Sequence, residues 1–155
     1  MPTTDTALVY VSTCIFESTK QASEGRGTTQ PFEFIGAPNY DGRALADEMN
    51  RQKLDGVIFR PVCFTPTFSK FKGELCSGVQ LHVRDRDAFS PFAAGVKLVE
   101  TVRNMYGTEF DEKSSKRTFG TGRLFDGVDS DTIIKDCLKT SEEFRKVTSP
   151  YYIYK

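Results

Sequence analysis

The chain lacks several features that would indicate metal, membrane or nucleic-acid chemistry. It has a single histidine and no Cys-x-x-Cys pair, so the ligand spacing of a zinc site is absent. No apolar run approaches the roughly 20 residues that a membrane-spanning helix requires. The 21 basic residues balance the 21 acidic ones, with a pI near 6.6, which gives no electrostatic attraction to nucleic acid. We therefore expect no metal, no cofactor, no nucleic-acid partner and no membrane span.

The length and the cysteines are typical of a single domain that is stable without cross-links. A chain of 155 residues buries enough core to fold without disulfides or metals. The four cysteines, Cys14, Cys63, Cys76 and Cys137, each lie in or beside an apolar run. Two disulfides would need an oxidising compartment, and we expect buried free thiols instead.

The start of the chain shows no signal peptide, because no basic region is followed by an apolar one. Residues 1–4 lead at once into strand-like sequence, which is how a fragment of a longer protein would begin. The compartment therefore stays undetermined.

Apolar periodicity and turn residues predict the elements of the first half. Residues 7–11 form a short β-rich run that predicts a buried strand, followed by a polar loop over residues 17–30. A second strand is expected at residues 32–35. Asp41 is a good N-cap for a helix over residues 42–52, whose apolar residues share one face.

The rest of the chain predicts three more strands and two more helices. The expected elements, in order, are strands at residues 56–60 and 79–83, a helix at 91–106, a solvated charged turn at 111–116, a final helix capped by Ser130 or Asp131 that ends before Pro150, and a terminal strand at 151–154. Phe64, Phe68 and Phe71 fit a groove wall and packing under a long loop equally well. The expected architecture is a single α+β (mixed α/β) domain with one mixed sheet packed against about three helices.

The stretch Glu24-Gly25-Arg26-Gly27-Thr28 is the strongest candidate for a binding loop. Glu24 can accept hydrogen bonds or shuttle a proton, and Arg26 can hold a carboxylate with two parallel bonds. The glycines allow the backbone to come close to a ligand. The simpler interpretation is a turn with a solvated ion pair worth less than about 1 kcal/mol. A phosphate loop is disfavoured, because neither Gly-Lys-Ser/Thr nor the Gly-x-Gly-x-x-Gly spacing is present.

The longer string from Ser23 to Pro38 resembles the C-terminal half of the NamZ family (DUF1343 type), exo-β-N-acetylmuramidases of peptidoglycan turnover. Further blocks resemble the same family in the same order and span the chain from about Thr6: Phe59-Arg60-Pro61 with Phe64-Thr65-Pro66, Cys76 to Val83 with Asp85-Arg86, and Phe144 with Tyr151 to Tyr154.

The chain departs from the family pattern at a few positions. Asn39 and Cys137 stand where the family often has tryptophans, and the chain has no tryptophan at all. Residues 20–22 replace a shorter link that contains an asparagine, and Thr148 stands where an arginine is common. These changes concern sugar stacking and domain docking rather than the fold.

The resemblance implies a role in cell-wall sugar hydrolysis. Family members join an N-terminal Rossmann-like domain, absent from this chain, to a smaller C-terminal domain, with the sugar site in the cleft between them. The chain would then complete a site for a peptidoglycan-derived muramyl saccharide and would be weak or inactive alone. The family context is bacterial, extracytoplasmic or in cell-wall recycling. The alternative is a catalytically silent carbohydrate-binding or interaction module derived from that fold.

The site residues follow from this resemblance together with the side-chain chemistry. We expect Glu24 to be the catalytic carboxylate, with Glu17 and Glu33 as weaker candidates. Arg26 suits the lactyl carboxylate that distinguishes N-acetylmuramic acid from N-acetylglucosamine. The other expected substrate-binding residues are Gly25, Gly27, Thr28 and His82; the alternative for His82 is a hydrogen-bonded structural residue.

Overall fold

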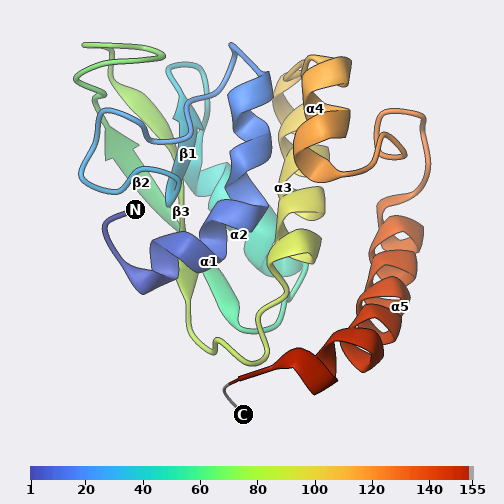
Figure 1. The fold of residues 1–155 in the computed structure, drawn as a ribbon. Coiled ribbons are helices and arrows are strands. Elements are labelled where there is room, and N and C mark those ends of the chain that lie inside the picture. Colours follow the sequence, from blue (N-terminus) through green and yellow to red (C-terminus); the bar gives the residue numbers. More distant parts are fainter. Residues whose placement is uncertain (154–155) are drawn as a thin grey trace.

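A computed structural model describes residues 1–153 and contains one three-stranded sheet (Figure 1). The strands are β1 (Phe34–Ala37), β2 (Val57–Phe64) and β3 (Cys76–Val83). Their order is β1-β3-β2, and β3 pairs antiparallel with each neighbour, with Gly36 opposite Gly78 and Arg60 opposite Gln80. The expected α+β class with one sheet is confirmed, and all of the pairing is antiparallel.

Helices cover this small sheet and account for most of the regular secondary structure. The five α-helices are α1 (Thr4–Thr13), α2 (Gly42–Arg51), α3 (Pro91–Tyr106), α4 (Glu112–Phe119) and α5 (Ser130–Thr148), with 3-10 turns at Cys14–Ser18 and Ser149–Tyr151. Helix α2 packs against β2 and β3, and α3 packs against both α1 and α2. Helix α5 lies beyond α3 (Figure 1) and packs against it near its start, where Ile133 is buried, whereas residues 139–147 are all exposed.

Helices α2 and α3 confirm the sequence prediction closely. The Asp41 carboxylate accepts from the backbone N–H of Arg43 and Ala44, both at 3.0 Å, and so caps α2. Helix α3 begins at Pro91 and ends at Tyr106, and it is followed by the C-cap Gly107, whose left-handed φ of 66° suits a glycine. The buried faces of these helices meet the sheet in one core built from Leu45, Met49, Val79, Leu81, Val96 and Val99.

The strand predicted at residues 7–11 is wrong, because this stretch lies in α1. Thr3 caps the helix in a capping box with Thr6, whose backbone N–H donates to the Thr3 hydroxyl at 3.0 Å. A buried strand would enclose the whole run, whereas Val9 is fully buried and Val11 is 47% exposed. The motif loop therefore follows a helix and a 3-10 turn rather than the end of a strand.

Two further predictions near the C-terminus are corrected. The charged turn expected at residues 111–116 belongs to α4, which Asp111 caps by accepting from the Ser114 N–H at 2.8 Å. The terminal strand is replaced by the turn Ser149–Tyr151, and Tyr151 is 81% exposed. Residue 154 of that predicted strand lies outside the described residues. Helix α5 begins at Ser130, and its cap is Asp129 rather than the predicted Ser130 or Asp131.

The cysteines are all free, as predicted, but they differ in burial. Cys14 and Cys76 are buried, Cys137 is half-buried and Cys63 is exposed, so the expectation of burial is wrong for Cys63. Desolvation, followed by the nearby Glu74 carboxylate, raises the pKa of the Cys76 thiol to about 11. None of the helices within residues 1–153 has the length and apolar character to cross a bilayer.

Three glycines allow β1, β3 and the start of α2 to meet at close range. A Cβ on Gly78 would lie 2.0 Å from the carbonyl oxygen of Ile35, and one on Gly42 would lie 2.3 Å from that of Gly78. A Cβ on Gly36 would lie 2.5 Å from the Ser77 carbonyl oxygen. Because all of these neighbours are backbone atoms, a side chain at any of the three positions must push two elements apart.

We expect Gly78→Ala to lower the free energy of unfolding by about 2–3 kcal/mol, the usual cost of overpacking a core. Urea denaturation measures this. Gly107→Ala is the control, because its added Cβ meets nothing within 4 Å and only the left-handed backbone costs about 1 kcal/mol. Equal losses in the two variants would contradict the steric explanation.

Candidate functional site

The predicted motif forms a loop that lies against the segment from Pro66 to Lys70, which follows β2. The backbone N–H and the hydroxyl of Thr67 both donate to the Gly27 carbonyl, each at 2.9 Å. On its other side, Ser23 pairs with Gly36 of β1, through hydrogen bonds of 2.7 and 3.1 Å. The loop is therefore fixed at both sides before any charged contact is counted.

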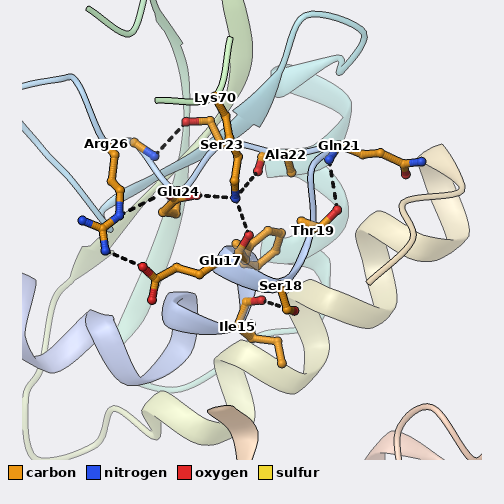
Figure 2. Close-up of polar contacts among 12 residues, drawn as sticks. Ile15, Glu17, Ser18, Thr19, Gln21, Ala22, Ser23, Glu24, Arg26 and Lys70 are labelled. Atoms are coloured by element: carbon orange, nitrogen blue, oxygen red, sulfur yellow. Dashed lines mark hydrogen bonds and ion pairs between the residues drawn. The ribbon is translucent and has the colours of Figure 1, made fainter. Parts of the chain in front are cut away.

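Glu24 lies at the centre of this arrangement and is only 2% exposed. Its Oε2 accepts from Lys70 Nζ at 2.6 Å, and its Oε1 is 3.2 Å from Arg26 Nε (Figure 2). Two cations thus compensate one buried carboxylate, as a charge removed from water requires.

Lys70 joins three separate parts of the chain. Besides Glu24, its ammonium donates to the carbonyl oxygens of Phe16 at 2.6 Å and Ala22 at 3.1 Å, so all three of its N–H bonds are used (Figure 2). Sequence reasoning missed this residue, because 46 positions separate it from Glu24 and nothing local to Lys70 indicates a buried partner.

Arg26 differs from Glu24 in that its side chain reaches solvent. The side chain is 42% exposed and pairs with Glu17, which is 38% exposed. Its guanidinium carbon lies 4.8 Å from the centre of the Phe32 ring, a cation–π contact. The hydrogen bond to Glu17 is the main cause that raises the pKa of Arg26 above its usual value.

Phe32 places its ring under Arg26 through an unusual backbone conformation. Its φ is +66°, a left-handed value that costs a residue other than glycine on the order of 1 kcal/mol. The Phe32 N–H donates to the Glu24 carbonyl at 2.6 Å, and its ring meets that of Tyr10 edge to face at 4.7 Å. These contacts hold the conformation and so fix the surface on which Arg26 rests.

The two glycines of the motif lie close to backbone atoms of neighbouring segments of the chain. Gly25 and Gly27 have φ values of +76° and +86°. A Cβ on Gly27 would lie 2.5 Å from the Phe68 carbonyl oxygen, and one on Gly25 would lie 2.9 Å from that of Gln30. Thr28 donates to the Gly25 carbonyl at 2.6 Å and accepts from the Gln30 N–H at 3.1 Å. All three residues therefore shape the loop that presents Arg26.

His82 is not brought to this loop by any contact among residues 1–153. It is exposed on β3 opposite Ile58. Gln80, on the same face, donates to Glu33 Oε2 at 3.2 Å. Glu33 is 7% exposed and also accepts from Thr6 at 2.5 Å and Thr3 at 3.3 Å. These donors are neutral, unlike the two cations that pair with Glu24.

Two cavities flank the segment before the motif. One of about 510 Å³ is lined by Glu17, Lys20, Gln21, Phe110, Asp111 and Ser114, among others. A second, of about 380 Å³, has Phe71 in its wall, whereas Phe68 is 59% exposed and Phe64 packs in the core. Phe71 thus fits both interpretations, because it lines the cavity and also packs against the core, whereas Phe64 fits the packing interpretation.

The arrangement has clear chemical capacities. The exposed edge of Arg26 can bind a carboxylate, and it lies next to the exposed Glu17 carboxylate. Glu24 Oε1 lies 3.2 Å from Arg26 Nε in an ion pair, and this oxygen can still accept a proton or a hydrogen bond from a hydroxyl. Within residues 1–153, no three His, Cys, Asp or Glu side chains are grouped to hold a metal ion.

Comparison with known proteins gives one consistent family. The family model described as "Exo-beta-N-acetylmuramidase NamZ, C-terminal" matches residues 8–154. The peptidoglycan beta-N-acetylmuramidase NamZ of Bacillus subtilis (strain 168) is 40% identical over 161 aligned positions, covering 99% of this chain and 39% of that protein.

Two crystal structures of DUF1343 family proteins from Bacteroides fragilis NCTC 9343 share the fold. One has a TM-score of 0.83 and 28% identity over 96% of this chain, and the other has 0.67 and 25% over 99%. The match covers 42% of each of those chains. The chain thus spans about two fifths of the length of these relatives.

We expect Lys70→Met to lower the free energy of unfolding by on the order of 3 kcal/mol, because Glu24 loses the stronger of its two cations while staying buried. Chemical denaturation measures this, with Lys72→Met, an exposed lysine of the same segment, as a control that changes stability by less than about 0.5 kcal/mol. Adding Glu24→Gln should recover part of the loss. A double variant as unstable as the sum of the single ones would show that the two groups do not interact.

Proposed function

The chain belongs to the family of NamZ C-terminal domains, and on this premise we propose that it forms part of a glycoside hydrolase that removes terminal N-acetylmuramic acid from peptidoglycan fragments. The B. subtilis relative is named a peptidoglycan beta-N-acetylmuramidase, and this chain covers 39% of it. We infer that the sugar site lies in a cleft between this domain and an N-terminal one, so that this chain supplies one wall.

The exposed, fixed guanidinium of Arg26 is the observation that carries this proposal. N-acetylmuramic acid differs from N-acetylglucosamine by a lactyl ether that ends in a carboxylate. A planar guanidinium with free N–H bonds recognises such a group better than a point charge does. Arg26 is held from behind by Glu24 and from below by Phe32, which leaves its outer edge toward solvent.

Glu24 is the proposed catalytic carboxylate of this domain, and it needs a second carboxyl group to act with. Hydrolysis of a glycosidic bond generally uses two carboxyl groups on either side of it. Glu24 Oε1 forms an ion pair with Arg26 and can accept a further bond, while Oε2 stays with Lys70. The second carboxyl group would come from Glu17 or from the rest of the site. Gly25, Gly27 and Thr28 contribute by shaping the loop, and His82 would contact a more distant part of the saccharide.

A catalytically silent carbohydrate-binding or interaction module is the alternative. The 2% exposure of Glu24 and its two ion pairs favour it, because such a group is typical of a structural pair. Asn39 and Cys137, in place of two tryptophans, favour it as well. If the module binds carbohydrate, Arg26 binds the sugar in both proposals, and they differ in whether Glu24 takes part in a reaction.

Arg26→Lys should weaken binding of a disaccharide with non-reducing N-acetylmuramic acid by about five- to tenfold and leave the N-acetylglucosamine analogue nearly unchanged. An NMR titration of the isotope-labelled chain measures both affinities from amide shifts. Arg51→Lys, at an arginine that is 70% exposed on α2, is the control and should alter neither. Equal effects on the two sugars would refute carboxylate recognition by Arg26.

A chimaera tests catalysis by joining this chain to the part of the B. subtilis relative that lies outside the match. If Glu24 acts on the reacting bond, Glu24→Gln should reduce kcat for release of N-acetylmuramic acid by about 10²-fold or more. The control Glu48→Gln removes an exposed carboxylate of α2 and should leave kcat unchanged. A chimaera that binds the disaccharide and releases no sugar would support the silent module.

A further inference from the structure

We propose that the Glu17 carboxylate occupies, in the free domain, the place on Arg26 that the carboxylate of the ligand takes, and that binding exchanges one for the other. The inference rests on the proposed recognition of N-acetylmuramic acid and makes Glu17 a residue that sets the affinity for the anionic ligand. Three properties of the Glu17–Arg26 pair carry it: the way Arg26 is held, the exposure of Glu17 and the balance of charge.

Arg26 has two supports besides Glu17. Its Nε is 3.2 Å from Glu24 Oε1, and its guanidinium rests on the Phe32 ring at 4.8 Å. Glu17 is held only by Nη2, and none of the protein groups described within residues 1–153 accepts a bond from Nη1. A guanidinium offers five N–H bonds. The outer edge of Arg26, formed by Nη1 and Nη2, can therefore bind a carboxylate with two parallel bonds once its one contact, to Glu17, is broken.

Glu17 is the partner that is readily exchanged. It lies on the 3-10 turn Cys14–Ser18, is 38% exposed, and makes its one side-chain hydrogen bond within the described chain to Arg26. It also lines the 510 Å³ cavity, into which its side chain can turn when it leaves Arg26. Glu24, with 2% exposure and a second cation, has no such freedom. An exposed pair contributes little to stability, so its exchange costs little.

The charge balance makes the exchange selective for anions. Glu17 and Glu24 carry two negative charges, and Arg26 and Lys70 carry two positive ones, so the linked group is neutral. A ligand carboxylate that replaces Glu17 at Arg26 restores the same pairing. A neutral sugar has nothing to offer Arg26 in exchange and leaves the Glu17 contact in place. The internal carboxylate therefore competes with anionic ligands for Arg26 and does not affect the binding of neutral ones.

The test compares Glu17→Gln with the unaltered chain by NMR titration, using N-acetylmuramic acid and N-acetylglucosamine as probes. Removal of the competing carboxylate should tighten binding of N-acetylmuramic acid by about two- to fivefold, as expected for an exposed ion pair, without changing that of N-acetylglucosamine. Glu48→Gln is a matched control, because Glu48 is also 38% exposed and pairs with an arginine. It should leave both affinities unchanged.

Arg26→Met in the same comparison separates this inference from the proposed function. The gain from Glu17→Gln should disappear in the Arg26→Met background. Binding of N-acetylmuramic acid that depends on Arg26 but does not tighten in Glu17→Gln would overturn the exchange and leave carboxylate recognition standing. If neither the unaltered chain nor Glu17→Gln prefers N-acetylmuramic acid, both proposals fail.

Discussion

The ion pair between Lys70 and the buried carboxylate of Glu24 is the interaction on which the candidate site depends. A buried carboxylate is costly unless cations and hydrogen bonds compensate it, and Lys70 does so while it also holds the carbonyl groups of Phe16 and Ala22. One ammonium group thus fixes the 3-10 turn, the motif loop and the segment after β2 in one geometry. Arg26 takes its position from that geometry, because its Nε rests on the same carboxylate.

Burial separates two carboxylates that the sequence presents as similar. Glu24 lies inside the motif and is nearly inaccessible, whereas Glu17 lies outside it and shares the exposed edge of Arg26. The group that organises the loop and the group that meets solvent are therefore different residues. This division suits a binding site, since the positioning contacts stay in a region of low dielectric and the recognition contact stays exchangeable.

Local signals in the sequence were sufficient wherever a cap and a clear apolar face occur together. Asp41 with α2, and Pro91 with Gly107 for α3, define both ends of their helices. Residues 7–11 were wrongly predicted as a strand, because the prediction followed their β-rich composition and not the capping box that Thr3 forms with Thr6. Helix α4 was missed for the opposite reason, since its buried residues are only Ser115 and Phe119 and leave little apolar pattern to detect. The pairing of Glu24 with Arg26 is local and was foreseen as an ion pair, but its burial depends on Lys70, which only the three-dimensional fold brings near.

The contacts of Lys70 also determine how this part of the molecule opens. Because one ammonium group holds three segments, none of them can separate from the others without leaving a charge or a carbonyl group unsatisfied. Residues 16–28 and 66–70 therefore form a single cooperative unit, although almost forty residues separate them in the chain. Their backbone amides should exchange with deuterated solvent together and at a common rate, while exposed residues 139–147 of α5 exchange independently and faster. A loop built in this way moves as one rigid piece, and the guanidinium of Arg26 moves with it.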